Sequence, residues 1–211
     1  MTARWTLVVP VKPAAFGKSR LVVPHVDRVA LARAIALDTI AAAAACAVVD
    51  QVVVVGDDGG LALLAGDIPG LRFVAEDGPS GIDAAVATGL RSFSGLRGAL
   101  LGDLPALQPT ELARALALAA EVDRAVVADA EGTGSTLVTA RPDVPWESSF
   151  GEGSFARHVA LGCVGLQIPD ASTLRRDVDT YDQLRAAQAL RLGPRTSALL
   201  APRDGVTPSK P

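Results

Sequence analysis

The sequence predicts a single α/β domain with a mostly parallel central sheet. Short runs rich in β-branched residues alternate along the chain with longer stretches rich in Ala and Leu, which is typical of strands linked by helices. Several of the short runs are apolar throughout, as expected for parallel strands that are covered on both faces. With 211 residues, 49% of them hydrophobic, the chain is long enough to bury one full core.

The strands and helices are expected in regular succession. The expected strands are the apolar runs Thr6–Val11, Gln51–Val55, Arg72–Ala75, Gly98–Leu101, Ala125–Ala128 and Thr136–Ala140. The expected helices are the Ala/Leu-rich stretches Arg28–Cys46, Gly59–Ala65, Ile82–Phe93, Pro109–Ala120, Phe155–Leu161 and Tyr181–Leu190. Pro109 suits the first position of its helix, and Glu111 falls in the first turn. We expect residues 1–200 to form the domain and the Pro-rich, polar residues 201–211 to form a disordered tail.

Composition argues against several classes of protein. The net charge of −3 offers no basic excess for a nucleic-acid backbone, and the 4% of aromatic residues are few for a single-strand binder. The longest apolar stretch, Ala34–Val49, is largely alanine and contains Asp38, so it falls short of the ~20 strongly apolar residues of a membrane span. Thr6–Val11 is too short for the apolar part of a secretory signal. Cys46 and Cys163 are isolated and suit the core better than a disulfide or zinc site. We therefore expect a soluble, cytoplasmic protein with neither nucleic-acid nor membrane partners.

The loop after the first strand carries cations. In a parallel sheet, ligands bind beyond the carboxyl ends of the strands, so the loops that follow strands are the ones to inspect. Lys12, Lys18 and Arg20 fall within nine residues, and two of them are among the three lysines of the chain. Such a loop could wrap polyphosphate, although it lacks the spacing of a P-loop. The alternative is an ordinary solvated cationic loop.

Three carboxylates are candidate metal ligands. Asp103 follows Gly102 at the end of the fourth expected strand, and Asp177 and Asp179 alternate around Val178, so that in an extended segment both point the same way. Like charges on one face repel unless a cation joins them, and oxygen ligands suit Mg²⁺. The alternatives are that Asp103 caps the turn before the Pro109 helix and that Asp179 is the N-cap of the last expected helix.

Two further loops could form anion pockets. Residues 131–136 and 148–158 interleave glycines with hydroxyl side chains, and the second runs into the N-terminus of an expected helix. Glycine- and serine-rich loops without any ligand are the alternative explanation. His158 could be catalytic or an ordinary helix-surface histidine.

Taken together, these stretches resemble a known family. The chain is similar to the phosphoenolpyruvate / 2-phospho-L-lactate guanylyltransferases, small nucleotidyltransferases of coenzyme F-420 biosynthesis that are related to molybdopterin guanylyltransferase. The matching stretches occur in family order: Val11-Lys12 through Lys18-Ser19-Arg20-Leu21, Gly102-Asp103-Leu104-Pro105-Ala106-Leu107, Gly132-Thr133-Gly134-Ser135, Phe150-Gly151 through Ser154 and Ala156-Arg157-His158, and Asp177-Val178-Asp179-Thr180. The Phe-Gly-x-x-Ser-x-x-Arg-His segment is the most specific of them.

The resemblance implies a fold and a reaction. The fold would be a single-domain, GT-A-like nucleotidyltransferase, a three-layer sandwich around a mostly parallel sheet. The enzyme would move GMP from GTP onto a phosphorylated carboxylic acid and release pyrophosphate. The acceptors of the family are phosphoenolpyruvate, 2-phospholactate and 3-phosphoglycerate, and the Lys-poor composition, typical of a GC-rich actinobacterial source, favours phosphoenolpyruvate. A downstream transferase would take the product.

The resemblance also implies residue roles. Asp103, Asp177 and Asp179 would hold Mg²⁺; Ser135, Gly151 and Ser154 would bind the phosphate and carboxylate of the acceptor; Lys12, Lys18 and Arg20 would contact the phosphates of GTP.

The chain departs from the family pattern at two positions. Ser135 stands where Thr is expected, and Asp83 stands where relatives carry a Gly/Pro-Leu-Asn segment near the donor. The alternatives are a nucleotidyltransferase for another nucleotide, such as CTP, or for a sugar phosphate, and a nucleotide-binding module without catalysis.

Overall fold

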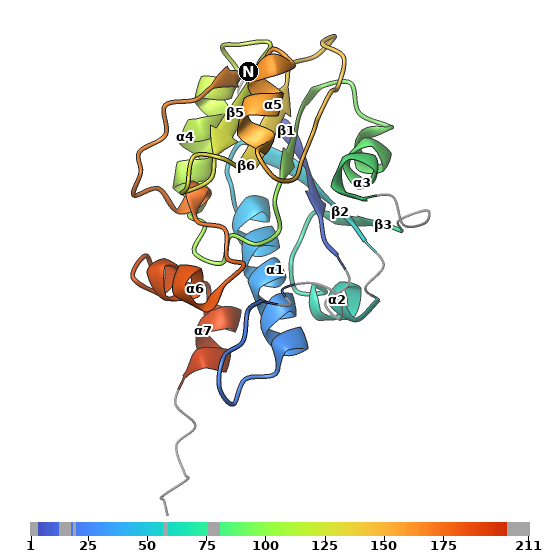
Figure 1. Cartoon of the computed structure of the whole chain (residues 1–211). Coiled ribbons are helices and arrows are strands. Elements are labelled where there is room, and N and C mark those ends of the chain that lie inside the picture. Colours follow the sequence, from blue (N-terminus) through green and yellow to red (C-terminus); the bar gives the residue numbers. More distant parts are fainter. Residues whose placement is uncertain (1–3, 13–17, 19, 57–58, 76–80, 202–211) are drawn as a thin grey trace, which may run out of the picture.

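A computed structural model describes residues 4–12, 18, 20–56, 59–75 and 81–201 of the chain (Figure 1). The strands are β1 (Trp5–Pro10), β2 (Val49–Val55), β3 (Leu71–Val74), β4 (Leu96–Leu100), β5 (Arg124–Ala128), β6 (Ser135–Ala140) and β7 (Val164–Gly165). The helices are α1 (Arg28–Ala44), α2 (Gly59–Leu64), α3 (Gly81–Leu90), α4 (Pro109–Ala119), α5 (Ser154–Ala160), α6 (Tyr181–Gln188) and α7 (Pro194–Leu200), with a 3₁₀ turn, η1, at Thr173–Arg175.

The strands form one sheet in the order β3-β2-β1-β4-β6-β5-β7. The pairs β1/β2, β1/β4, β2/β3 and β5/β7 are parallel, whereas β6 is antiparallel to both of its neighbours. Leu100 at the end of β4 pairs with Leu137 near the start of β6, and Ala128 at the end of β5 pairs with Ser135. Because β6 runs backwards, its first residues share an edge with the carboxyl ends of the other strands. Ligand-binding loops collect at that edge.

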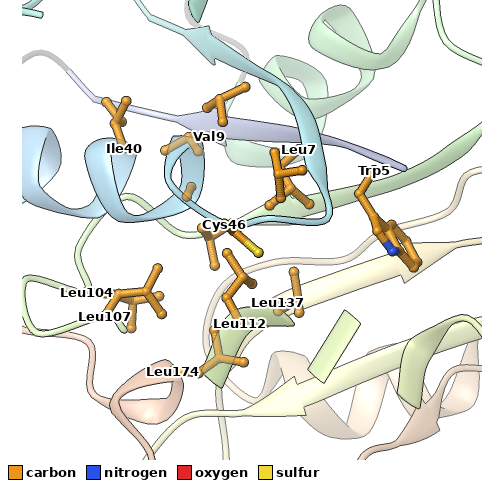
Figure 2. Packing of buried hydrophobic residues seen from close by; sticks show 14 of the residues in the cluster. Trp5, Leu7, Val9, Ile40, Cys46, Leu104, Leu107, Leu112, Leu137 and Leu174 are labelled. Atoms are coloured by element: carbon orange, nitrogen blue, oxygen red, sulfur yellow. The ribbon is translucent and has the colours of Figure 1, made fainter. Parts of the chain in front are cut away.

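Helices cover both faces of the sheet, which gives three layers. Alternate residues of each strand point to opposite faces, so Leu7 and Val9 face the larger core beneath α1 and α4, while Val8 faces α3. The larger core is aliphatic apart from Trp5 and Cys46, as the composition requires (Figure 2). On the α3 side, a second small cluster of Val126, Val138 and Cys163 lies under the loop before α5. Both cysteines are buried and free, as the sequence predicts.

Every predicted strand and helix is present, with ends that differ by a few residues. The largest difference is in α3, which ends at Leu90 rather than Phe93. The short elements β7, η1 and α7 were not predicted. Pro194 at the first position of α7 was the available signal. The predicted tail at 201–211 lies outside the described residues beyond Ala201. Across the described segments, no helix has the length and apolar character that crossing a bilayer requires.

Candidate active site

The three predicted metal ligands come together at the carboxyl edge of the sheet. The backbone N–H of Val178 donates to the carbonyl oxygen of Asp103 at 3.0 Å, which holds the 177–179 segment against the loop after β4. Val178 is fully buried, and its neighbours Asp177 and Asp179 point the other way, as the alternation predicts. One carboxylate oxygen from each of Asp103, Asp177 and Asp179 lies within 4.8 Å of the other two.

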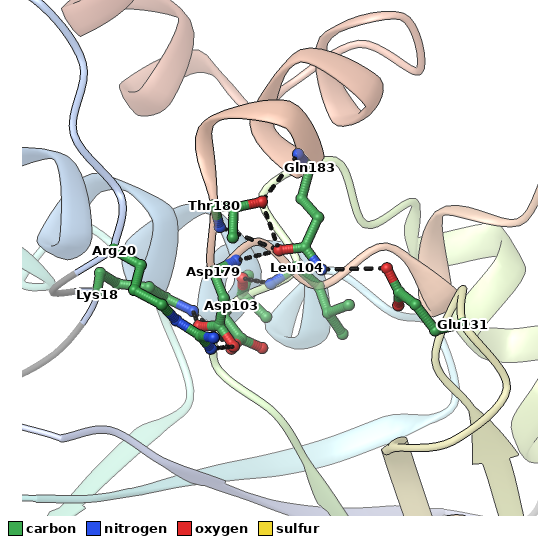
Figure 3. Close-up of polar contacts among 9 residues, drawn as sticks. Lys18, Arg20, Asp103, Leu104, Glu131, Asp179, Thr180 and Gln183 are labelled. Carbon is green, nitrogen blue, oxygen red and sulfur yellow. Dashed lines mark hydrogen bonds and ion pairs between the residues drawn. The ribbon is translucent and has the colours of Figure 1, made fainter. Parts of the chain in front are cut away.

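Lys18 reaches into this carboxylate cluster (Figure 3). Its Nζ donates to Asp103 Oδ2 at 2.7 Å and to Asp179 Oδ1 at 2.8 Å. The alternative of a solvated cationic loop is therefore wrong for Lys18, whose side chain is 12% exposed. Arg20 lies 4.0 Å from Asp179 Oδ2 and is 76% exposed, and Lys12 is exposed as well. Residues 13–17 and 19 of the same loop lie outside the described residues.

The charges of the cluster are unbalanced. Burial, and then the nearby carboxylates led by Asp103, raise the pKa of Asp177 to about 7. Burial also works against ionisation of Asp179, but the ammonium of Lys18 outweighs it and holds the pKa of Asp179 below its usual range. Burial likewise opposes the charge of Lys18, and Asp103 and Asp179 nevertheless raise its pKa. One lysine thus neutralises part of the cluster, and within the described segments Asp177 forms no ion pair.

The donor set fits a divalent cation. Asp103 Oδ1 and Asp177 Oδ1 are buried and have no hydrogen-bond partner within the described part of the chain. A buried anionic oxygen without a partner is costly, whereas a hard cation such as Mg²⁺ is bound by oxygen ligands of this kind.

The structure rules out the two capping alternatives for these aspartates. Thr180, not Asp179, is the N-cap of α6, and it forms a reciprocal capping box with Gln183 (Figure 3). The amide oxygen of Gln183 also accepts from the backbone N–H of Asp179 at 2.9 Å. The capping residues therefore fix the backbone of Asp179 and leave its carboxylate available. Asp103 does not cap the turn before α4, because its Oδ2 is bound by Lys18 and its Oδ1 has no partner among the described residues.

A second group of carboxylates adjoins the first. Asp129, Glu131 and Asp177 also bring one oxygen each within 4.8 Å of one another. Asp129 accepts from the backbone N–H groups of Thr133 and Gly134 at 2.9 and 2.8 Å, and a Cβ at Gly134 would collide with this carboxylate. Asp129 is not among the residues predicted from the sequence. Its place directly after β5, like that of Asp103 after β4, was the signal that could have found it.

The residues expected to bind the acceptor follow the 129–134 turn in the chain. Ser135 begins β6 and Ser154 begins α5; both are buried, and their hydroxyl oxygens are 3.2 Å apart. Gly151 has φ +111°, a conformation that L side chains rarely adopt. Arg157 donates to the carbonyl oxygens of Ser149 and Phe150 and so fixes the loop around Gly151.

His158 is not on the helix surface, contrary to one of the two expectations. It is fully buried, its Nδ1 lies 2.9 Å from Ser135 Oγ, and its Nε2 accepts from the backbone N–H of Ser149 at 2.9 Å. The burial of the ring also lowers the pKa of His158. Three predicted candidates from two segments, Ser135 on β6 and both Ser154 and His158 on α5, thus form one buried network.

Asp83 contacts the loop that precedes the residues expected to bind the acceptor. Its Oδ1 accepts from Ser148 Oγ at 2.7 Å and from the backbone N–H of Phe150 at 3.1 Å. Asp83, which stands where relatives carry a Gly/Pro-Leu-Asn segment, is therefore hydrogen-bonded to the 148–150 loop. Residues 76–80, which include Pro79 and Ser80 of the same predicted segment, lie outside the described residues.

Comparison with known proteins gives a consistent result. Residues 5–186 match the profile of the family described as "Guanylyl transferase CofC like". The phosphoenolpyruvate guanylyltransferase of Thermomonospora curvata is 47% identical, over 97% of this chain and 92% of its own. That of Streptomyces scabiei is also 47% identical, over 94% and 96%. Among solved structures, a nucleotidyl transferase from Methanothermobacter has a TM-score of 0.56 at 18% identity, over 89% of this chain and 97% of its own. This last likeness concerns the fold, which is of the nucleotidyltransferase type, as the sequence predicts.

Proposed function

The chain belongs to the family of CofC-like guanylyl transferases, and on that premise we propose that it transfers GMP from GTP to phosphoenolpyruvate and releases pyrophosphate. The product would enter coenzyme F-420 biosynthesis, where a downstream transferase would consume it. The relatives that are 47% identical over nearly the whole chain carry the name phosphoenolpyruvate guanylyltransferase, which supports this choice of acceptor.

One structural observation carries the proposal. Asp103, Asp177 and Asp179 converge at the carboxyl edge of the sheet, and two of their buried oxygens have no partner among the described residues. Unpaired buried carboxylates destabilise a protein unless a ligand completes them, so the arrangement supports a site that binds a cation.

The reaction needs little acid–base chemistry from the protein. The acceptor is a phosphate monoester, so one of its phosphate oxygens can attack the α-phosphorus of GTP directly. A new bond forms from that oxygen to the α-phosphorus, and the bond to the bridging oxygen of the leaving pyrophosphate breaks. Both reactants are anions, so catalysis consists of positioning and charge neutralisation. The buried hydroxyl and imidazole groups therefore need not act as nucleophiles.

Each group of residues has a distinct task in this proposal. Asp103, Asp177 and Asp179 would hold Mg²⁺, which when bound offsets the mutual repulsion of the two sets of phosphates. The cations Lys12, Lys18 and Arg20 would bind the triphosphate and stabilise the departing pyrophosphate. Ser135, Gly151 and Ser154 would bind and orient the acceptor.

The site also implies how Lys18 is used. In this structure its ammonium is held by Asp103 and Asp179. An ammonium has three N–H donors, so Lys18 keeps one that could contact a phosphate of GTP, and a divalent cation on the same carboxylates would compete with the ammonium for them. Binding of metal and nucleotide would then be mutually dependent.

The deciding experiment is an assay of pyrophosphate release. The full-length protein is incubated with GTP and Mg²⁺ together with phosphoenolpyruvate, 2-phospholactate, 3-phosphoglycerate or no acceptor, and the series is repeated with CTP and ATP. We expect release only with GTP, Mg²⁺ and a phosphorylated acid, fastest with phosphoenolpyruvate. A preference for CTP, or for a sugar phosphate added as a further acceptor, would favour the other nucleotidyltransferase alternative. Nucleotide binding without release in any arm, even with a transferase added to remove product, would favour the binding module.

A further inference from the structure

His158 is the centre of a buried hydrogen-bond network on the acceptor side of the site. Its Nδ1 lies 2.9 Å from the hydroxyl of Ser135 on β6, and its Nε2 lies 2.9 Å from the backbone nitrogen of Ser149 in the loop before α5. Phe150 packs edge-on against the imidazole, with 4.9 Å between ring centroids. The histidine is fully buried and cannot itself reach a substrate in solvent, so any role in the reaction must act through a neighbour.

The contact with Ser149 fixes which nitrogen of the ring carries the hydrogen. A backbone N–H can only donate, so Nε2 must accept with its lone pair. In a neutral imidazole the single hydrogen is then on Nδ1, where it faces Ser135 Oγ at 2.9 Å and also the backbone of Ser154, one turn earlier in α5. Burial of the ring lowers the pKa of His158 and Arg157 adds to the shift, whereas Asp83 and a hydrogen bond with the backbone of Ser154 oppose it, so the neutral form prevails at neutral pH.

This tautomer determines what the hydroxyl of Ser135 can offer. A serine hydroxyl has two lone pairs and one hydrogen. The oxygen of Ser135 accepts from His158 Nδ1 and from Ser154 Oγ, so both lone pairs are engaged. With Ser154 as the donor of this pair, the only hydrogen of Ser135 points away from both partners. With the hydrogen on Nε2 instead, Ser135 would donate to the ring and show a lone pair, which repels an anion.

Asp83 anchors the 148–150 loop, which carries the Ser149 N–H that His158 accepts. Its carboxylate accepts from Ser148 Oγ and from the N–H of Phe150, on either side of Ser149. The peptide N–H of Ser149 is thus held toward Nε2 of the histidine. The connection runs from Asp83 through the 148–150 loop and His158 to Ser135.

We propose that His158 is a positioning residue: by donating from Nδ1, it directs the Ser135 hydroxyl hydrogen at an anionic oxygen of the acceptor, a phosphate or a carboxylate. The inference rests on the proposed function, since it takes Ser135 to contact the phosphorylated acid. The same arrangement favours anionic acceptors over neutral ones, because a hydroxyl held as a donor has no lone pair left for a donor group on the ligand.

The first test observes the tautomer in the wild-type protein. A long-range ¹H–¹⁵N correlation spectrum of ¹⁵N-labelled protein reports which imidazole nitrogen carries the hydrogen. The chain has two histidines, and the other, His25, is exposed, so a His25→Gln variant assigns the signals. We expect the hydrogen of His158 on Nδ1 at neutral pH. A hydrogen on Nε2, or a doubly protonated ring, would overturn the inference without any variant of the network having to fold.

The second test uses steady-state kinetics to compare two variants of His158, one that mimics Nδ1 and one that mimics Nε2. Asn at position 158 can place an amide N–H near the position of Nδ1 and still donate to Ser135. Gln reaches toward the position of Nε2, where it can accept from Ser149 but cannot donate to Ser135. Loss of one hydrogen bond to a charged group corresponds to about 10- to 100-fold. We expect His158→Gln to lower kcat/KM for phosphoenolpyruvate by this factor with KM for GTP unchanged, and His158→Asn to retain most of the activity. Equal losses in the two variants, or a parallel rise in KM for GTP, would overturn the inference.

A double-mutant cycle completes the test. If His158 acts through Ser135, then His158→Gln should change kcat/KM by less than about 3-fold once Ser135→Ala is present. Full additivity of the two losses would mean that His158 does not act through this hydroxyl. Wild-type protein that releases no pyrophosphate with any phosphorylated acid would contradict the proposed function, whereas an inverted tautomer would contradict the role of His158 alone, so the two failures are distinguishable.

Discussion

The ammonium of Lys18 lies 2.7 Å from Oδ2 of Asp103, although 85 residues separate the two in the chain. The side chains are only 12% and 21% exposed, so the pair is partly shielded from water and its attraction is stronger than that of a surface ion pair. Lys18 therefore supplies the positive charge of the carboxylate cluster in this structure. A divalent cation that binds the same oxygens has to compete with it.

Replacing Lys18 by Met should strengthen binding of a divalent cation in the absence of nucleotide. The competing ammonium is gone, and coupling between contacting charges of ~1–2 kcal/mol corresponds to roughly 10-fold in affinity. Calorimetric titration with Mn²⁺ measures it. Lys18→Arg, which keeps the charge, is the matched control. An affinity for Mn²⁺ that is unchanged or weaker in Lys18→Met would show that the lysine and the cation do not share these oxygens.

Asp177→Asn should lower kcat/KM by two orders of magnitude or more, because a metal ligand supplies several kcal/mol of transition-state charge stabilisation. Its fold should persist, since Asp177 Oδ1 has no hydrogen-bond partner among the described residues that the change could break. The control is Asp182→Asn, an exposed carboxylate on α6. Pyrophosphate release at saturating Mg²⁺ decides the matter, and near-normal turnover of Asp177→Asn would remove this residue from the metal site.

The metal-free protein should lose stability as the pH rises from about 4 to about 7. The pKa of Asp177 is raised from 3.8 to about 7 in the folded state, first by burial and then by Asp103 and its other acidic neighbours. Between these values the unfolded chain has released the proton and the folded protein has kept it, so the folded protein binds more protons and rising pH favours unfolding.

Asp177→Asn removes this titration, and its free energy of unfolding should exceed that of the wild type by about 1–3 kcal/mol at pH 8, with little difference at pH 4. Urea unfolding in EDTA at the two pH values measures it. A variant that is less stable than wild type at pH 8 would contradict the prediction. Saturating Mg²⁺ should reverse the order, because only the wild type keeps the full ligand set.

Asp83→Ala should weaken the acceptor side of the site and spare the nucleotide side. The change frees Ser148 and the N–H of Phe150, so the 148–150 loop loses its anchor. We expect KM for phosphoenolpyruvate to rise by about 10-fold, as for the loss of hydrogen bonds to a charged group, while KM for GTP stays constant. Steady-state kinetics with each substrate varied in turn distinguish the two. A rise in KM for GTP alone would place Asp83 at the donor instead.

Local patterns in the sequence predict most of the fold and half of the site. The strands and long helices follow from apolar runs, and the Asp177–Val178–Asp179 alternation correctly places two carboxylates on one side, because a buried valine fixes the direction of its neighbours. Asp103 is found from its place after a strand, and that inference needs only the topology of a parallel sheet.

The remaining features depend on contacts that no local pattern encodes. His158 lies in a short helix that carries Arg157, Val159 and Ala160 on exposed positions, so nothing local marks its ring as the buried one. Its ring is hydrogen-bonded by Ser135 and Ser149 and packed by Phe150, all in other segments. Lys18 was expected at the phosphates, and its two aspartate partners are 85 and 161 residues away. Contacts between residues so far apart in the chain depend on the three-dimensional fold and cannot be predicted from a local sequence pattern.

The buried carboxylate of Asp38 links the folding of this domain to the order in which the chain is made. Its side chain is 1% exposed, and the partners that the described chain gives its oxygens all come from the start of α7: the backbone N–H groups of Arg195 and Thr196, at 3.1 and 2.8 Å, and the guanidinium of Arg195 at 3.8 Å. Gly193 approaches so closely that a Cβ there would meet the carboxyl group. These partners are synthesised more than 150 residues after Asp38. A core closed around α1 without α7 would bury this carboxylate without them, which costs folding free energy.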